Sequence, residues 1–259
     1  MDFEDTPEEA AFRAEANKWL SANAKLRGSK SSRDEMEEME NGAAAEMAAS
    51  RAWQKTKAKA GYARITWPKG MGGMGGTPMQ SIIFGQEESK YDVATGGPFA
   101  IGLGMCIPTL MAYGNEEAKK RYVWPAVQGD EIWCQLFSEP AGGSDVAGLR
   151  TKAEKDGDEW VINGQKIWTT GAQFSDYGIL LTRTDPNVPK HKGLTMFYID
   201  MHDPAVEVRP IKQASGGSGF NEVFFTDLKV KDSQRLGEVG QGWQVALTTL
   251  MHERLAVGG

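Results

Sequence analysis

The sequence predicts an α+β fold, in which an all-α helical N-terminal domain precedes an antiparallel, β-barrel-like middle domain. Three observations support this prediction. Apolar side chains recur at helical spacing over much of residues 1–129, short β-type runs separated by turns fill residues 130–235, and a helical period returns over residues 236–259. Strands that follow one another without intervening helices are typical of antiparallel sandwiches or barrels.

The first helix is expected to begin at Thr6. Thr6 supplies a capping hydroxyl, Pro7 suits the first turn, and Glu9 stands three residues after the cap. Four apolar side chains then fall on one face of the helix, those of Phe12, Ala16, Trp19 and Leu20. This face is the one that we expect to pack into a core.

Further helices are predicted over residues 33–60, 77–90 and 98–113, and Asn41-Gly42 is a candidate break in the first of them. Residues 61–78 are too rich in glycine and proline to form a regular element. Asn115 is expected to cap another helix, in which acidic residues come first and basic residues follow, as the helix dipole favours.

The β-type runs are short and rich in β-branched and aromatic residues. Asn163-Gly164 lies between two of them, and this dipeptide predicts a two-residue hairpin turn. Four later runs are expected to be strands, at residues 177–185, 193–200, 206–211 and 221–230. Beyond residue 236, a predicted amphipathic helix places on one face Trp243, Leu247, Leu250 and Met251, with no later segment in the sequence to cover them.

The composition is that of a soluble globular protein, with 40% hydrophobic and 25% charged residues. A formal net charge of -6 argues against a nucleic-acid backbone as the main partner. The acidic N-terminus lacks the order of a signal peptide, and no apolar run approaches the length of a membrane span. Cys106 and Cys134 are too few for a disulfide framework, so we expect buried thiols in a reducing cytoplasm.

Several familiar sites are absent from the sequence. The three histidines, His191, His202 and His252, are far apart and lack metal-ligand spacing, which favours surface or packing roles. No nucleophile elbow, P-loop or Gly-x-Gly-x-x-Gly turn between a strand and a helix occurs. A nucleotide cofactor would therefore bind by a route other than a Rossmann turn.

Three segments together carry a stronger signal: FSEPAGGSDVAG at residues 137–148, INGQKIWTTGA at residues 162–172 and GEVGQGWQVALTTLMHER at residues 237–254. With these motifs the chain resembles the acyl-CoA dehydrogenase family. The resemblance implies a helical domain, a β-barrel-like domain and a C-terminal four-helix bundle, of which this chain would hold only the first helix. The domains would span residues 1–129, 130–235 and 236–259.

The same resemblance implies an activity. Family members use FAD to oxidise the Cα–Cβ bond of an acyl-CoA thioester in fatty acid β-oxidation, and pass the electrons to an electron-transferring flavoprotein. A base removes the α-proton and the β-hydrogen leaves as hydride. A complete bundle would assemble a homotetramer. Two other interpretations stay open: a non-catalytic partner subunit of a heteromeric dehydrogenase, and an acyl-CoA oxidase.

The resemblance also assigns residues to the cofactor. The residues expected to contact FAD are Gln135, Phe137, Ser138, Gly143, Ser144, Trp168, Thr169 and Thr170. Within this set, Trp168 corresponds to the aromatic that packs on the flavin and Thr170 to a hydrogen bond near flavin N5. Ser144 would contact FAD phosphate or acyl-CoA. Taken singly, each is equally an ordinary strand, core or turn residue, and only their joint order carries the prediction.

Glu253 is the candidate base, and Arg254 beside it is a candidate substrate-binding residue. A carboxylate that removes an α-proton works best in an apolar pocket, where loss of water raises its basicity. In isovaleryl- and long-chain-type relatives the base lies on this helix just before an arginine, whereas most relatives place it later in the bundle. The alternative is a solvent-facing glutamate paired with a neighbouring base.

Overall fold

The computed structural model describes residues 4–28, 32–94, 97–214 and 216–257. The chain divides into two compact units. One comprises the residues up to Gly97 together with Val127–Asp130, and the other comprises Pro98–Ala126 together with the residues from Glu131 onward. The three-part division at residues 129 and 235 stays a prediction. Along the described chain, no helix combines the length and apolarity needed to cross a membrane.

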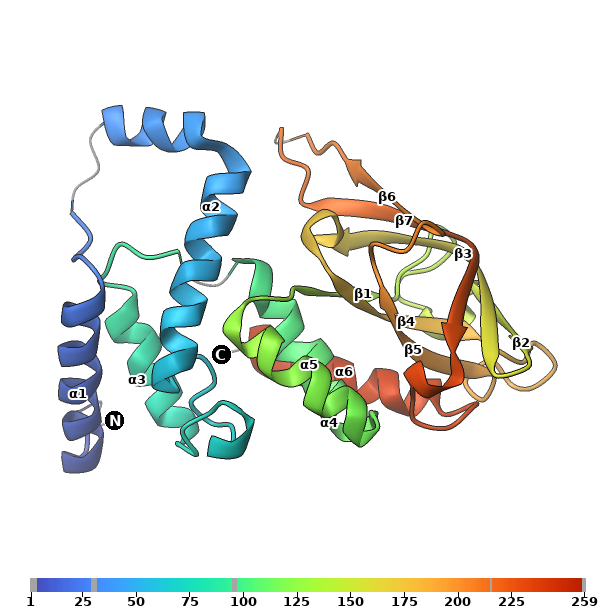
Figure 1. The fold of residues 1–259 in the computed structure, drawn as a ribbon, viewed down its shortest axis with the longest axis horizontal. Coiled ribbons are helices and arrows are strands. Elements are labelled where there is room, and N and C mark those ends of the chain that lie inside the picture. The colour runs from blue at the N-terminus through green and yellow to red at the C-terminus, as the bar shows by residue number, and fades with distance from the viewer. Residues whose placement is uncertain (1–3, 29–31, 95–96, 215, 258–259) are drawn as a thin grey trace. The chain divides into compact units, whose positions relative to one another are not determined.

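The first unit is helical and holds α1 (Pro7–Asn23), α2 (Ser32–Ala60), the short turn η1 (Lys69–Met71) and α3 (Pro78–Glu88) (Figure 1). The predicted cap of α1 is confirmed, because Thr6 Oγ1 accepts the Glu9 amide at 3.3 Å and the Glu9 carboxylate accepts the Thr6 amide at 2.8 Å. The predicted break at Asn41-Gly42 is wrong, since α2 continues through both residues.

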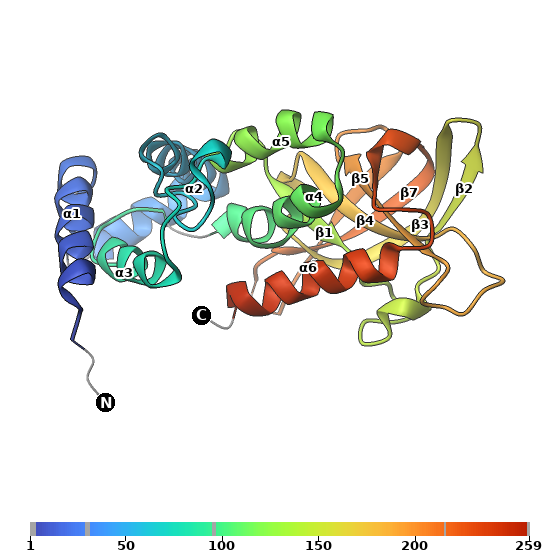
Figure 2. The same ribbon diagram turned by 90° about the horizontal axis from the view of Figure 1, so that it is seen from below.

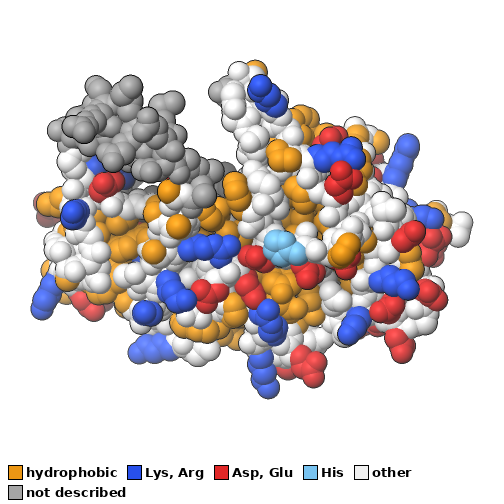
Figure 3. All heavy atoms as spheres, turned by 45° about the horizontal axis from the view of Figure 1, so that its top comes forward, with side chains coloured by type: hydrophobic (Ala, Val, Ile, Leu, Met, Phe, Trp, Pro, Cys, Tyr) orange, Lys and Arg blue, Asp and Glu red, His pale blue; other side chains and the backbone are white. Residues whose placement is uncertain are grey.

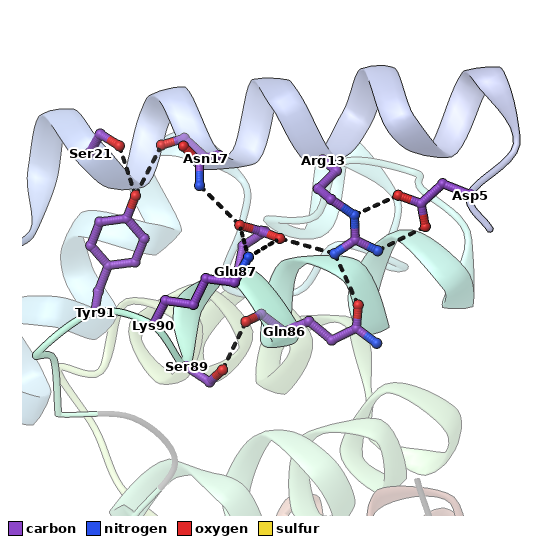
Figure 4. A network of polar contacts seen from close by, with 9 residues as sticks. All are labelled: Asp5, Arg13, Asn17, Ser21, Gln86, Glu87, Ser89, Lys90 and Tyr91. Atoms are coloured by element: carbon purple, nitrogen blue, oxygen red, sulfur yellow. Dashed lines mark hydrogen bonds and ion pairs between the residues drawn. The ribbon is translucent and has the colours of Figure 1, made fainter. Parts of the chain in front are cut away.

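Helices α1 and α3 are joined by apolar packing and by a polar network. Phe12, Ala16 and Leu20 are buried in the core of this unit, as predicted. In the network drawn in Figure 4, the Arg13 guanidinium lies 3.0 Å from the buried Glu87 carboxylate, which also accepts from Asn17 at 2.9 Å. The buried charge of Glu87 is thus matched by cations and an amide, as a carboxylate out of water requires.

The second unit begins within η2 (Gly97–Phe99) and continues through the π-helical turn η3 (Gly102–Cys106), α4 (Ile107–Tyr113) and most of α5 (Glu116–Gln128). The predicted cap of α5 is confirmed by a 2.8 Å hydrogen bond from the Ala118 amide to Asn115 Oδ1. Cys106 and Cys134 are free and buried, and burial raises the pKa of the Cys134 thiol to about 12. Both therefore serve as small apolar side chains.

The rest of this unit is an eight-stranded sheet whose strands follow the order β6-β7-β3-β2-β4-β5-β8, with β1 paired to β4. The strands are β1 (Trp133–Leu136), β2 (Lys152–Asp156), β3 (Glu159–Thr170), β4 (Tyr177–Arg183), β5 (Leu194–Asp200), β6 (Val206–Ile211), β7 (Phe220–Lys231) and β8 (Arg235–Leu236). The short turns η4 (Val146–Gly148), η5 (Ala172–Phe174) and η6 (Asp232–Gln234) lie between strands, and α6 (Gly242–Val257) follows β8.

The predicted β-type middle domain is confirmed, but its sheet is not closed into a barrel and is not antiparallel throughout. Strands β1 and β4 pair in parallel, and β2 meets β4 through a single parallel pair, Lys152 with Arg183. The sheet stays open because its two edges are β6 and β8, and β8 is only two residues long. So short a strand offers too few backbone groups for a closing ladder.

The hairpin turn predicted at Asn163-Gly164 is also wrong, because β3 runs through both residues and pairs with β7 over most of its length. The turn lies instead between β2 and β3, where Gly157 has a φ of 60°. Gly164 occupies a register shift of the β3–β7 ladder, and a Cβ there would lie 2.5 Å from Thr151 Oγ1. The close approach of β3 to the segment around Thr151 therefore explains the glycine at position 164.

Helix α6 packs along α4 and over β5 (Figure 2). Thr249 Oγ1 lies 2.9 Å from Thr109 Oγ1, and the buried side of the helix carries Val245 and Ala246. Leu247 and Met251, on the predicted apolar face, are 44% and 59% exposed. The helix thus packs on the sheet through its small residues and leaves larger apolar side chains in water.

Candidate functional site

The predicted FAD motifs meet where β1 runs into the loop at residues 137–151 and passes beside β3. The Ile167 amide donates to the Ser138 carbonyl at 2.9 Å, and Lys166 Nζ donates to the Phe137 carbonyl at 3.0 Å. Segments almost thirty residues apart in sequence are therefore hydrogen-bonded neighbours. We refer to this region as the β1–β3 junction.

Trp168 is the most exposed aromatic side chain of the junction. It lies at a shift in the β3–β7 register and has a φ of 60°, which is unusual for a residue other than glycine. Its indole is 57% exposed and meets the Phe220 ring edge-on, with 6.2 Å between the ring centroids. The bulge thus turns a large flat side chain toward solvent in a strained conformation of the kind often found at functional sites.

The two threonines after Trp168 have different surroundings. Thr170 is exposed, whereas Thr169 is buried and its Oγ1 has no hydrogen-bond partner in the described structure. The Thr169 carbonyl accepts from Asn221 Nδ2 at 3.0 Å, which ties this end of β3 to β7. Trp168 and Thr170 are thus both exposed, and the Thr170 hydroxyl forms no hydrogen bond with another described residue.

The β1 side of the junction differs from the prediction in one respect. Gln135 and Ser138 are half-buried, but the ring of Phe137 is only 4% exposed. Its aromatic side chain belongs to the core, and the junction uses the Phe137 carbonyl instead. An apolar wall at this point is offered by Trp168 and Phe220 rather than by Phe137.

The loop after Ser138 presents small residues to solvent. Gly143 and Ser144 are exposed, and a Cβ added at Gly143 would meet no atom within 4 Å. Packing inside the chain therefore does not explain the glycine at this position. The loop is fastened by Asp145, whose carboxylate lies 2.8 Å from Lys190 Nζ, and the Lys190 ammonium lowers the pKa of Asp145.

A buried ion pair lies under the junction, and its role was missed in the sequence. Lys166 Nζ lies 2.9 Å from Glu139 Oε1, and the Glu139 carboxylate also accepts the amides of Arg150 at 2.6 Å and Thr151 at 2.9 Å. The available signal was strand alternation, which places Lys166 on the inward side of β3 with buried Ile162.

Burial and pairing act in opposite directions on this pair. Burial lowers the pKa of Lys166 to about 8, although the Glu139 carboxylate opposes that change. Burial also disfavours the charged form of Glu139, but the Lys166 ammonium and the two amides outweigh it, and the pKa of Glu139 is lowered. At neutral pH the pair is therefore a buried carboxylate and ammonium.

Glu253 and Arg254 lie near the end of α6. Glu253 is half-buried and Arg254 is exposed. Across the part of the chain that the structure describes, Glu253 forms no hydrogen bond or ion pair. The role of Glu253 as the base stays a prediction.

The histidines and one surface depression do not involve the predicted site residues. His191 packs edge-on against Trp243, and His202 Nε2 lies 3.2 Å from Asp176. Within the described ranges, no cluster of side chains could hold a metal ion. An open depression of about 420 Å³ lies in the helical unit, but it contains none of the predicted residues and is lined by Ala22, Asn23, Ala24, Lys25, Asp92 and Val93.

Comparison with known proteins identifies the family to which the chain belongs. The model for the acyl-CoA dehydrogenase N-terminal domain matches residues 6–130, and the model for the middle domain matches residues 134–228. The chain belongs to the acyl-CoA dehydrogenase family. The resemblance stated from the sequence motifs is therefore confirmed.

Relatives agree with this assignment. The chain is 37% identical over 248 residues to acyl-CoA dehydrogenase IpdE1 of Mycobacterium tuberculosis, covering 94% of this chain and 62% of that protein. It is 32% identical over 202 residues to mitochondrial isovaleryl-CoA dehydrogenase of Pongo abelii, covering 77% of this chain and 48% of that protein.

Among solved structures, the ChsE4-ChsE5 complex from M. tuberculosis matches with a TM-score of 0.77 and 28% identity, over 97% of this chain and 61% of that chain. The chain thus spans about three fifths of the length of IpdE1 and of the matched chain in the ChsE4-ChsE5 complex.

Family members are flavoproteins, and the residues of the junction fit FAD. An exposed indole on a bulge offers a flat apolar surface, Thr169 Oγ1 is buried without a partner, and Gly143 leaves open space beside the loop. Flavin sites combine an apolar wall with a few placed hydrogen-bonding groups. Trp168 would supply that wall, and the Ser138 and Thr170 hydroxyls would supply polar contacts.

Proposed function

We propose that this protein carries out the FAD-dependent α,β-dehydrogenation of an acyl-CoA thioester to a trans-2-enoyl-CoA. The observation that supports it best is the β1–β3 junction, where a strained bulge presents the exposed Trp168 indole beside the Ser138 and Thr170 hydroxyls. Such an exposed ring in a strained backbone is costly unless a bound molecule covers it. Electrons would pass to an electron-transferring flavoprotein.

The cofactor residues follow from this proposal. FAD would be held by Gln135 from β1, by Phe137, Ser138, Gly143 and Ser144 from the loop at residues 137–151, and by Trp168, Thr169 and Thr170 from β3. Of these, Phe137 would contribute through its backbone, because its ring is buried. Bound FAD supplies the acceptor for the hydride that leaves the β-carbon. The chain's own task is to orient the flat ring, exclude water from it and place the thioester against it.

Glu253 would remove the α-proton, with Arg254 and Ser144 contacting the substrate. The Glu253 side chain is half-buried near the end of α6, and Arg254 follows it in the sequence as in relatives with the base on this helix. The curated relatives include an isovaleryl-CoA dehydrogenase, the type in which the base is expected on this helix.

The test of the base is the Glu253→Gln variant. We expect it to bind FAD as the wild-type chain does, while the rate of flavin reduction by acyl-CoA falls by about 10²–10⁴-fold, the contribution typical of a positioned base. The rate is measured anaerobically from the loss of the visible flavin band. A normal rate in this variant would remove Glu253 from the mechanism.

A non-catalytic partner subunit is the second candidate function. It is favoured by the exposed Leu247 and Met251 on α6 and by the match to one chain of a solved two-protein complex. Spectroscopy separates the candidates. Purified protein that takes up FAD and is bleached by acyl-CoA supports the dehydrogenase, whereas protein that cannot take up FAD supports the partner subunit. Peroxide formed in proportion to product in air would indicate an oxidase.

A further inference from the structure

The Lys166–Glu139 ion pair is placed where it can set the geometry of the FAD-binding segments. The Lys166 side chain has no exposed surface, and that of Glu139 is 5% exposed. Buried ion pairs add little net stability, because both charges lose their water. The position of the Lys166–Glu139 pair in the junction therefore matters more than the contribution of the pair to folding.

The contacts of the pair end on each segment that carries a predicted FAD residue. Lys166 donates to the Phe137 carbonyl, next to Ser138, and stands two residues before Trp168. Glu139 accepts the amides of Arg150 and Thr151, so one carboxylate at the start of the loop holds the end of the loop that carries Gly143 and Ser144. The pair thus connects β3 with both ends of the loop at residues 137–151 through charge-assisted hydrogen bonds.

We propose that Lys166 and Glu139 are positioning residues for FAD: the pair fixes the spacing between the Trp168 bulge and the two ends of the loop at residues 137–151. This inference rests on the proposed function. The pair does not touch the reacting atoms, and it acts through the segments that it joins. Its loss would leave those segments folded but displaced from the arrangement that the cofactor needs.

The experiment compares FAD binding with folding in four variants of the full chain: Glu139→Gln, Lys166→Met, the double variant E139Q/K166M, and Asp232→Asn as the control. Asp232 also joins strands by polar contacts, to Trp160 Nε1 at 2.7 Å and to Arg235, but it lies outside the junction. The dissociation constant of FAD comes from quenching of flavin fluorescence, and the visible circular dichroism of bound flavin reports its surroundings.

We expect each single variant to bind FAD about tenfold more weakly and to melt at a lower temperature without FAD, because one buried charge is left without its partner. The double variant should regain most of the lost melting temperature, because no unpaired charge remains, yet still bind FAD about tenfold more weakly with altered visible circular dichroism. Asp232→Asn should lose stability and keep the wild-type affinity.

Wild-type affinity and circular dichroism in the double variant would overturn the inference and reduce the pair to a structural contact. If Lys166→Met does not fold, Glu139→Asp decides, since it keeps the charge but is too short to reach Lys166 and both amides. Unchanged FAD affinity in Glu139→Asp would also overturn the inference. Failure of the wild-type chain to bind FAD would instead contradict the proposed function itself.

Discussion

Trp168 combines two properties at the residue scale that rarely occur together: it is large and exposed, and its backbone is left-handed. A left-handed conformation costs a residue with a Cβ roughly 1–2 kcal/mol. The cost is opposed by β7 pairing on both sides of the bulge, which over-determines the local backbone. The strained backbone thus lowers stability at this position but turns the Trp168 indole toward solvent.

Replacing Trp168 separates the effect of its exposed side chain from the effect of its left-handed backbone. Trp168→Gly should leave the free energy of unfolding unchanged or raise it by up to about 1 kcal/mol, because glycine adopts this conformation without strain. FAD affinity should fall about tenfold, the loss expected for one aromatic contact. Urea unfolding and FAD titration measure both. Trp124→Ala, which removes another exposed indole, serves as the control, and equal FAD losses in the two variants would contradict a specific role for Trp168.

Asp232 provides a pH-dependent contact in the same unit. Hydrogen bonds from Arg235 and Trp160 lower the pKa of Asp232 to about 2. Because its folded-state pKa lies below its unfolded value, its contribution is complete above about pH 5 and is lost as the pH falls through 4 toward 2.

We therefore expect Asp232→Asn to lower the free energy of unfolding by about 1–2 kcal/mol at pH 7, a value reduced for solvent screening because a third of the side chain is exposed. The difference from wild type should shrink toward zero near pH 2. Urea unfolding at several pH values measures it. A difference that stays constant down to pH 2 would show that the charge of Asp232 is not responsible.

At the scale of elements, β3 is the strand on which the junction depends. It pairs with β2 on one side and β7 on the other, and it carries both the close approach at Gly164 and the bulge at Trp168. The first irregularity lets the segment around Thr151 come near, and the second turns the indole outward. Both depend on β3 continuing past Asn163.

Gly164→Ala tests that continuity. The added Cβ would lie 2.5 Å from Thr151 Oγ1 and 2.6 Å from Thr151 Cα, so backbone must move. Overpacking of this kind costs about 2–3 kcal/mol of unfolding free energy. Gly143→Ala, where a Cβ meets open space, should change stability by less than about 0.5 kcal/mol. Similar losses of stability in both variants, measured by urea unfolding, would refute the close-approach explanation.

Acidic side chains outnumber basic ones in the sequence, by 35 to 29. On the face shown in Figure 3, acidic and basic side chains of the described residues are mixed, in keeping with the formal net charge of -6. Exposed apolar side chains occur on several elements, and on α6 two of them, Leu247 and Met251, lie one helical turn apart. Exposed apolar side chains that adjoin on a helix favour association with other proteins.

The double substitution Leu247→Gln with Met251→Gln should therefore reduce concentration-dependent self-association, seen as lower scattering of light at equal protein concentration. Its free energy of unfolding should change by less than about 1 kcal/mol, because neither side chain is buried. Val245→Gln is the matched control on the buried side of α6 and should destabilise the fold strongly. Unchanged association in the double variant would show that this face does not drive it.

Local sequence alone determined the capping of helices, the class of each large segment and the motif order that indicated the family. Thr6 with Glu9, Thr77 with Gln80, and Asn115 act within three residues of themselves, so their hydrogen bonds follow from the sequence. The order of the motif residues is likewise a property of the sequence itself. The family comparisons confirmed the resemblance to acyl-CoA dehydrogenases that this order indicated.

Only the tertiary structure decided the open sheet, the continuous β3, the buried ring of Phe137 and the Lys166–Glu139 pair. Each depends on a partner far away in the sequence: β7 keeps Asn163-Gly164 extended, and Glu139 makes it possible to bury Lys166. A local pattern states what a residue prefers by itself, whereas these outcomes were set by the free energy of long-range pairing and burial, which outweighs such preferences.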